Sequence, residues 1–494
     1  MSTAADRRPV GYTLQPFEER LALLELERAL DPRMLAFTAR IGGHATHQFY
    51  FDRFTKLQGD GGALSLRLQA EATNDGHRGA AHNYLTHGLH SYKGKYFPQL
   101  VRALLNAAPA VAPGQVVDPF VGSGTTTLEA SLMGFAAHGI DRNPLAALIA
   151  RTKVAVLQLD PDAAAGAADE LVASADASRG GDLANRQYLE RWFPPDTLRL
   201  IERILGGAAR ADVAPALRDL ARLSLSALLR QWSLQEPTQL RIFRRETAPP
   251  AEQLRVRWEN EVRQTCAGVL TGLRLLRELE IEPGAVSTVE GDARESATWH
   301  GQQFDALVTS PPYAAALPYI DTDRLSIYAL GLADVGDRSA LEWAMIGNRE
   351  LRKRQRLDLE ARLQDNADGL PERVVTDIAE IKRRNDAAGV GFRRENLPAL
   401  LYRYFADMAA VLCEASAHLK PGALCAIVIG DSYTSAGDER FQMRTADFLC
   451  DVAESLRFTV EERIVMGGQS SYLPHQRNTI PSEDILMFRA PHMA

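Results

Sequence analysis

The stretch "GQVVDPFVGSGTTTLEASLMGFAAHGID", Gly114–Asp141, decides the fold of this chain. The apolar runs at its two ends predict two strands, at 114–120 and 135–141. Between them, the residues from Thr125 onward predict a helix that is closed by Gly134. Strand, helix and strand joined by such short links favour a parallel sheet flanked by helices.

The same alternation continues along the chain. Asn143 and Pro144 open a second helix as its N-cap and first residue. Later segments predict a long helix at 397–419, a turn at Lys420–Gly422 and another helix at about 441–456. Further strands are expected at 285–293, 304–313, 423–431, 458–466 and 484–490, the last two as antiparallel neighbours. The predicted fold class is therefore α/β, with a Rossmann-like sheet of about seven strands.

Two long segments interrupt the sheet. Residues 158–282 are rich in Ala, Leu and Arg at helical spacing, and residues 322–395 are helical and heavily charged. Both are too long for simple loops, so we expect inserted helical subdomains. The sheet would then be built from 86–157, 283–321 and 396–494, preceded by an N-terminal region, 1–85, that begins with an amphipathic helix.

Bulk composition narrows the class of protein. The chain has 494 residues, of which 46% are hydrophobic, with a net charge of −7. No apolar run is long enough to span a membrane, and the N-terminus lacks a signal-like core, so we expect a cytoplasmic protein. The four cysteines form no CxxC pair, which favours reduced thiols and no metal site.

The glycines after the first strand predict a ligand site. Gly122 and Gly124 let the backbone approach a ligand closely, and the following helix offers free N–H groups. Asp141 ends the next strand, where its carboxylate can accept hydrogen bonds from two ribose hydroxyls. Thr127 replaces the third glycine of the dinucleotide fingerprint, and Asp118 suits a cationic ligand better than a pyrophosphate. S-adenosylmethionine fits this pattern.

A second motif, "TSPPY" at Thr309–Tyr313, completes a resemblance. Together with "DPFVGSGTT" it is similar to the motifs of the S-adenosylmethionine-dependent DNA amino-methyltransferases, which make N4-methylcytosine or N6-methyladenine. The segment His90–Leu105, the "GDARE" at 291–295 and the closing strands also resemble that family. The resemblance covers roughly 85–155, 285–335 and 396–490 and leaves out the N-terminal region and the insertions.

The resemblance implies a methyltransferase sheet, S-adenosylmethionine as cofactor, and double-stranded DNA as partner, with a restriction endonuclease or defence partner as a further expectation. His90, Tyr92 and Lys93 either line the cofactor pocket or serve packing. Tyr319, Asp321 and Arg324 are candidates to close over a base. The implied cofactor-binding residues are Tyr92, Asp118, Pro119, Phe120, Gly122, Ser123, Gly124, Thr125, Asp141, Arg142, Asp292 and Ala293, and the implied catalytic residues are Ser310, Pro311, Pro312 and Tyr313.

Residues 310–313 also suit the chemistry. The exocyclic amine of a base is a poor nucleophile, because its lone pair is delocalised into the ring. The Ser310 hydroxyl and the Pro311 carbonyl can accept hydrogen bonds from both N–H groups of the amine, and the two prolines hold these acceptors in place. Tyr313 can stack on a base that has swung out of the duplex.

Several functions remain compatible with these residues. Serine before Pro-Pro favours cytosine N4 over adenine N6, and disfavours an RNA methyltransferase, whose related motif usually carries Asn or Asp. No cysteine stands at this strand end, which disfavours cytosine-C5 chemistry. A regulator that has lost catalysis is the alternative from another class. The basic runs inside 158–282 and 322–395 make both insertions candidates for DNA contact, the first for target recognition, and Arg352, Arg354, Arg383 and Arg384 are the expected contacts in the second.

Overall fold

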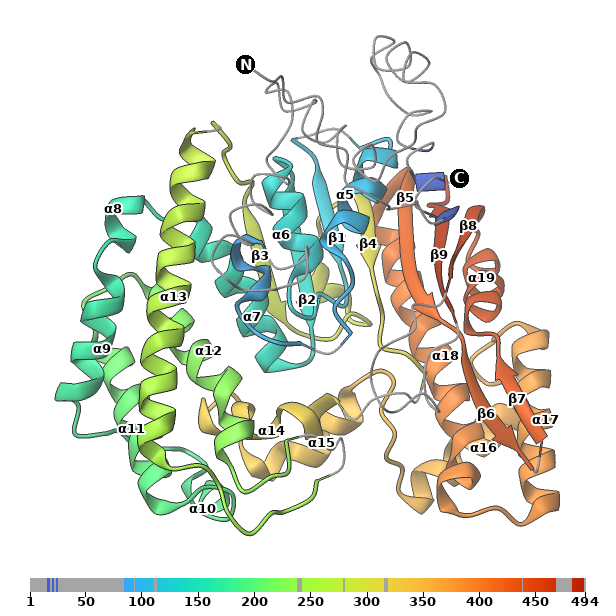
Figure 1. The fold of residues 1–494 in the computed structure, drawn as a ribbon. Coiled ribbons are helices and arrows are strands. Elements are labelled where there is room, and N and C mark those ends of the chain that lie inside the picture. Colours follow the sequence, from blue (N-terminus) through green and yellow to red (C-terminus); the bar gives the residue numbers. More distant parts are fainter. Residues whose placement is uncertain are drawn as a thin grey trace.

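The computed structural model describes residues 84–92, 94–110, 113–237, 242–278, 280–314, 319–437, 439–467 and 482–492, together with Pro16, Phe17, Arg20, Leu21 and Leu24. Its centre is a seven-stranded sheet in the order β3-β2-β1-β4-β5-β9-β8 (Figure 1). The strands are β1 (Gln115–Asp118), β2 (Ala136–Asp141), β3 (Val286–Glu290), β4 (Phe304–Thr309), β5 (Leu419–Gly430), β8 (Thr459–Gly467) and β9 (Ser482–Arg489).

The sheet confirms the predicted fold class. Strands β3, β2, β1, β4 and β5 run parallel to one another, and β9 is antiparallel to both β5 and β8. The expected antiparallel pair at the end of the chain is therefore present. Chain connections leave β1 toward β2 and β3 on one side, and β4 toward β5 on the other. The sheet thus has its topological switch point between β1 and β4.

Alternating side chains of the strands fill two cores. Val116 of β1 contributes to one core with α5 (Pro98–Ala107), while Val117 contributes to the opposite core with α18 (Phe392–His418). The same alternation divides Ala306 from Leu307 on β4. This is the pattern of strands that are buried on both faces, as parallel strands covered by helices must be.

Helices α6 (Thr125–Leu132) and α7 (Pro144–Ala155) follow β1 and β2 as expected. Gly134 has a φ of 83° just after α6. The side chain of Asn143 accepts a hydrogen bond from the backbone N–H of Leu145 at 3.1 Å, so it caps α7 as its position predicted. Helix α19 (Thr445–Ser455) also packs beside the sheet. The described residues further include the short 3-10 helices η2 (Leu85–Gly88), η3 (Val156–Gln158), η4 (Ser296–Trp299) and η5 (Val335–Asp337).

Both insertions are helical, as predicted. The first holds α8 (Pro161–Ala164), α9 (Ala167–Ala177), α10 (Arg186–Leu189), α11 (Pro195–Arg210), α12 (Pro215–Trp232) and α13 (Ala251–Glu278). The second holds α14 (Tyr319–Ala329), α15 (Arg338–Ala344), α16 (Lys353–Asp365) and α17 (Glu372–Ala388), and leads into α18. In Figure 1 the α8–α13 group and the α16–α17 group lie on opposite sides of the sheet, with α14 and α15 below it.

Three local predictions differ from the structure. Lys420–Gly422 lies within β5 at a break in register against β4, with Gly422 at a φ of 72°, so the expected turn is an irregularity inside a strand. Strands β6 (Ser432–Ala436) and β7 (Glu439–Met443) form an antiparallel hairpin that was not predicted. Because β7 occupies those residues, α19 begins at Thr445, later than expected.

The five described residues of the N-terminal region support the amphipathic helix predicted there. Pro16, Phe17, Arg20, Leu21 and Leu24 are helical, while the rest of 1–83 lies outside the described residues. Leu21 and Leu24 are buried in the same core as Val116, and Arg20 pairs with Glu462 of β8. Within the described ranges, no helix has both the length and the apolarity needed to cross a bilayer.

Candidate active site

The two motifs meet at the switch point of the sheet. Val116 and Val117 of β1 pair in register with Ala306 and Leu307 of β4, so the carboxyl ends of these strands lie side by side. Asp118 ends β1, and Ser310 follows β4 directly. In open α/β sheets, ligands bind in the crevice outside such carboxyl ends, where the chain connections diverge.

Asp118 joins the two motifs through hydrogen bonds. Its Oδ1 accepts from the Thr309 hydroxyl at 2.5 Å and from the Phe120 backbone N–H at 3.0 Å, and its Oδ2 accepts from the Thr126 hydroxyl at 2.6 Å. The side chain is fully buried, and burial raises the pKa of Asp118 to about 6 despite these bonds. Its visible contacts therefore hold the site together, and its expected contact with a cationic ligand stays a prediction.

Residues 122–124, here called the glycine corner, have the backbone that glycine permits. Gly122 and Gly124 have φ values of 50° and 79°. A Cβ on Gly122 would lie 3.1 Å from the ring of Tyr92, so Tyr92 packs against the corner, and its predicted contact with a cofactor stays a prediction. Between the glycines, the buried Ser123 hydroxyl has no hydrogen-bond partner among the described residues.

Asp141 faces the same corner from the end of β2. Its Oδ2 accepts from the Gly122 backbone N–H at 2.8 Å, and its Oδ1 accepts from the Asn143 N–H at 2.8 Å. Each carboxylate oxygen can accept more than one hydrogen bond, so capacity for ribose hydroxyls remains. Burial raises the pKa of Asp141 to about 7, and these backbone donors oppose the shift.

Asp292, after β3, is engaged by a residue that the sequence did not single out. Arg294 donates to both oxygens of Asp292, from Nε at 2.8 Å and from Nη2 at 2.6 Å, and pairs with Asp407 at 2.5 Å. These bonds lower the pKa of Asp292 against the effect of burial, which acts in the opposite direction. Asp292 is thus an ionised acceptor fixed at the carboxyl edge of the sheet.

Residues 310–313, here called the SPPY corner, are held from two sides. The Tyr313 hydroxyl donates to Oε1 of Glu483 on β9 at 2.6 Å, which anchors the outer end of the ring. Gly347 approaches from the second insertion, where a Cβ would lie 3.1 Å from Pro312 Cβ and 3.2 Å from the Tyr313 carbonyl. Ser310 is half-buried at the strand end.

The remaining predicted site residues lie around these corners. Tyr92 is half-buried, and Arg142 is exposed beside Asp141. The other implied residues surround the strand ends with little exposure: Pro119, Thr125, Ala293 and Pro311 are buried, and Phe120 and Pro312 are half-buried. His90 is buried and contacts the Ser226 hydroxyl at 3.0 Å, which shows a packing contact with α12, whereas Lys93 lies outside the described residues.

Helix α14 corrects one expectation. Arg324 does not face a base, because it is fully buried, stacks on Trp192 and donates to the Tyr188 hydroxyl at 2.9 Å. Asp321 is held by Arg338, and the side chain of Tyr319 lies outside the described part of the chain. The residue of α14 that reaches the site is Asp323, which accepts from the Asn143 amide at 2.9 Å.

Sequence reasoning missed Thr309, Arg294, Asp323, Glu483 and Gly347 as contributors to the site. Thr309 directly precedes the SPPY corner, so its place in the motif was the signal that could have identified it. Arg294 contacts Asp292 only two residues away, so its place in the segment 291–295 was also a local signal. The contacts of Asp323 and Glu483 instead cross 180 and 170 residues, and Gly347 approaches Pro312 from the second insertion. No local pattern announces such contacts.

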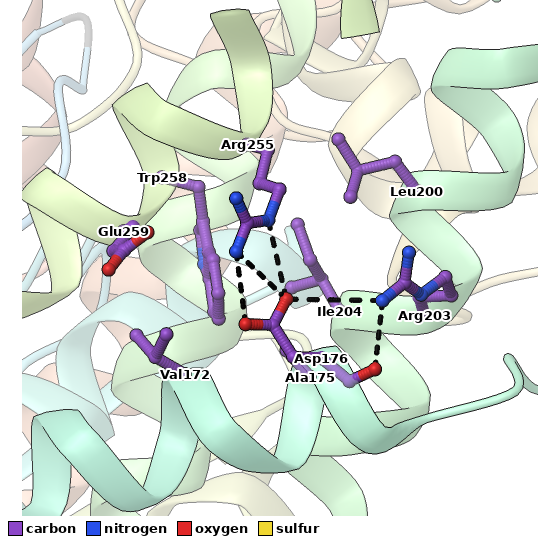
Figure 2. A pocket seen from close by; sticks show the side chains of 9 residues that line it. All are labelled: Val172, Ala175, Asp176, Leu200, Arg203, Ile204, Arg255, Trp258 and Glu259. Atoms are coloured by element: carbon purple, nitrogen blue, oxygen red, sulfur yellow. Dashed lines mark hydrogen bonds and ion pairs between the residues drawn. The ribbon is translucent and has the colours of Figure 1, made fainter. Parts of the chain in front are cut away.

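A hollow in the first insertion does not compete with this site (Figure 2). It lies between α9, α11 and α13 and has room for about 10 Å³, the space of one water molecule. Asp176 at its centre is bound by Arg255 at 3.0 Å, and Arg203 donates to the Asp176 carbonyl at 2.9 Å. The hollow is too small for a nucleobase, and its charges are already paired.

Fold and site together define a Rossmann-like α/β protein whose two motifs meet at the switch point between β1 and β4. No protein-family model matches the chain. It is similar to the type II methyltransferase M.MjaII of Methanocaldococcus jannaschii, with 46% identity over 68 residues, 14% of this chain and 13% of that protein. It is also similar to the type II methyltransferase M.MvaI of Kocuria varians, with 24% identity over 274 residues, 50% of this chain and 58% of that protein.

Two methyltransferases of known structure match the chain with low scores. A DNA modification methylase from Thermus thermophilus is 22% identical over 18% of this chain and 38% of that chain, with a TM-score of 0.15. The rRNA methyltransferase aviRa from Streptomyces viridochromogenes is 11% identical over 82% of this chain and 90% of that chain, with a TM-score of 0.29. Neither score carries an argument. Both relatives are named type II methyltransferases, which agrees with the resemblance that the motifs of this chain carry.

Proposed function

We propose that this protein is a DNA methyltransferase that moves a methyl group from S-adenosylmethionine to the N4 amine of a flipped cytosine. One observation carries the proposal: the hydrogen bond from Thr309 to Asp118 brings the SPPY corner and the glycine corner to one strand edge. The site proposed for the amine that receives the methyl group and the site proposed for the methyl donor are therefore next to each other. The type II methyltransferases that match the chain support the same reaction class.

The residues present fit S-adenosylmethionine. The unpartnered, buried Ser123 hydroxyl lies within the glycine corner, and the first turn of α6 supplies N–H groups that no helical carbonyl can satisfy. Asp141 would hold the ribose, and Tyr92 and Asp292 would flank the rest of the cofactor. When bound, the cofactor supplies an electrophilic methyl group on a sulfonium.

The SPPY corner would prepare the base. The Ser310 hydroxyl and the Pro311 carbonyl accept hydrogen bonds from the two N–H groups of the amine. The nitrogen lone pair therefore turns out of conjugation with the ring and points toward the methyl donor. The prolines fix the backbone that presents these acceptors, and Gly347 and Glu483 hold the corner from outside. Tyr313 would stack on the flipped base.

The choice of cytosine rests on Ser310, because serine before Pro-Pro is typical of the cytosine-N4 enzymes that this chain resembles. We also propose a role in restriction–modification or phage defence, with a cognate endonuclease or defence protein as partner. The support for this is that both curated relatives are named type II methyltransferases.

The test is nucleoside mass spectrometry of DNA from cells that express the protein. The expected product is N4-methylcytosine, and Ser310→Ala should lower turnover far more than cofactor affinity, because the lost contact acts on the reacting amine. N6-methyladenine alone would replace cytosine by adenine as the target. If the protein is folded and binds the cofactor but the DNA contains no modified base, the proposed reaction is wrong.

A further inference from the structure

A group of exposed cations lies at the beginnings of two helices of the second insertion, α16 and α18. Arg352, Lys353 and Arg354 open α16, and Arg393 lies in the first turn of α18, all with exposed side chains. None of the four takes part in an ion pair recorded within the described residues. We call these four residues the α16 basic patch.

The other cations expected to contact DNA behave differently. Arg383 on α17 pairs with Glu380 at 2.7 Å, and Arg384 pairs with both Glu380 and Glu439 at 2.7 Å. Their charges are therefore balanced inside the chain. The sequence predicted the same role for all four arginines. In the structure, Arg383 and Arg384 form ion pairs, whereas no ion pair within the described residues involves Arg352 or Arg354.

The position of the α16 basic patch runs against helix electrostatics. The N-terminus of a helix carries a partial positive charge and favours anions, and acidic side chains are usual there. The first turn of α16 has no acidic residue and begins instead with Lys353 and Arg354. Exposed side chains that depart from such a local rule are expected at functional contacts, here with an external anion.

The patch also lies within reach of the SPPY corner. Gly347 packs on Pro312 and the Tyr313 carbonyl, and the chain continues through the buried Leu351 into α16. The seven residues from Gly347 to Arg354 span at most about 25 Å. Duplex DNA carries one charge per roughly 1.7 Å of its axis, so a duplex that delivers a base to Ser310 presents phosphates within that distance.

Exposed apolar side chains accompany the cations. Leu357 and Phe392 are 51% and 59% exposed, which places them among the most exposed large apolar residues of the described chain. An ion pair between Arg356 and Glu395 joins the second turn of α16 to the first turn of α18, near both of them. These two exposed apolar side chains belong to the same two helices as the cations.

From these observations we infer that the α16 basic patch binds the phosphate backbone of duplex DNA beside the target base. This inference rests on the proposed function. The contacts are sequence-independent, because phosphates position a protein on DNA while base edges carry the specificity. The paired cations of α17 stay outside the contact.

Two matched double variants test the inference. Arg352→Gln with Arg354→Gln removes two charges from the patch, and Arg383→Gln with Arg384→Gln removes two paired charges from the same insertion. Binding to a short random-sequence duplex is measured between about 50 and 200 mM salt. Each lost phosphate contact reduces the salt slope by about 0.9, so over that range the wild type should lose about 12-fold more affinity than the first variant. The second variant should keep the wild-type slope.

Thermal unfolding and S-adenosylmethionine affinity of all three proteins establish that each is folded. Equal slopes for the first variant and the wild type overturn the inference, as does an equal loss in the second variant. Both outcomes leave the proposed function standing if the wild type methylates DNA. A wild type that neither binds nor methylates duplex DNA overturns the proposed function itself.

Discussion

Asp118 and Asp141 end neighbouring strands, and each is an acid in an environment that resists its charge. Burial raises their pKa values to about 6 and about 7, from an ordinary value of 3.8. A raised carboxyl pKa means that the folded state holds the proton more tightly than the unfolded chain. The contribution of these two carboxyls to the free energy of unfolding is therefore complete below the pKa that they have in the unfolded chain. It is lost as the pH rises from about 4 through about 7.

Asp141→Asn tests the ribose contact. The ionised carboxylate would accept from two ribose hydroxyls, whereas the amide of asparagine offers one oxygen and a competing donor. Affinity for S-adenosylmethionine should fall by roughly 1.5–3 kcal/mol, or about 10- to 150-fold. Because Asp141 loses its proton near pH 7, wild-type affinity should rise between about pH 6 and 8, while the variant should be insensitive to pH in this range.

Titration calorimetry at several pH values gives both readouts, with thermal unfolding as the control for folding. If Asp141→Asn kept wild-type affinity and the wild-type pH profile, Asp141 would have no part in holding the cofactor.

Local sequence predicted individual residues well where one strand and its following turn contain the whole signal. Gly122 lies in such a turn, and its backbone N–H donates to Asp141 at the end of the neighbouring strand β2. The partners that make the site rigid could not be predicted in this way. Thr309 reaches Asp118 across 191 residues, and Glu483 reaches Tyr313 across 170, so only the folded sheet brings them together.

At the scale of elements, Gly124 decides how α6 and α7 pack. It is the N-cap of α6 with a left-handed φ of 79°, and a Cβ there would lie 2.8 Å from the Cα of Ala150 on α7. Both the backbone conformation and the close approach of the helices require glycine. The glycine corner therefore depends on helix packing as much as on ligand contact.

Gly124→Ala should cost about 2–5 kcal/mol of unfolding free energy, the sum of left-handed strain and overpacking. Gly166→Ala is the matched control, since Gly166 is the N-cap of α9 with a φ of 75°, and a Cβ there would have no neighbour within 4 Å among the described residues. The control should lose only the strain, about 1–2 kcal/mol. Urea unfolding measures both, and equal losses would show that contact with Ala150 does not matter.

The β6–β7 hairpin shows where element prediction fails. Its sequence lacks an apolar alternation, so it carried no strand signal. The hairpin is held instead by α17, where Asn385 accepts a hydrogen bond from the Gly437 backbone at 2.9 Å and Arg384 pairs with Glu439. The turn glycine, with a φ of 60°, was the one local clue. At Lys420–Gly422 the error was the reverse, since a turn was predicted where the structure has a strand. Turns and strand irregularities use the same residue types.

At the scale of the whole molecule, α14 connects the first insertion to the site. Arg324 stacks 4.3 Å from the centre of the Trp192 ring and donates to Tyr188 and Gln235, all three in the first insertion. One residue earlier, Asp323 binds Asn143, whose backbone N–H donates to Asp141. The chain that follows the SPPY corner thus contacts both the first insertion and the residues that hold Asp141.

Arg324→Ala should loosen the first insertion without dismantling the sheet. The change leaves the hydroxyl of Tyr188 and the buried amide of Gln235 without their partner and opens a space beside Trp192, at a cost of about 2–4 kcal/mol. Gln235 anchors the connection between α12 and α13, so limited proteolysis should cleave the variant first within residues 242–250. Arg338→Ala is the control, because Arg338 pairs with Asp321 and Glu342 at a more exposed position and should cost less than about 1 kcal/mol. Identical cleavage patterns and unfolding temperatures for the two variants would show that the insertion is held by its apolar core alone, and that α14 does not couple it to the site.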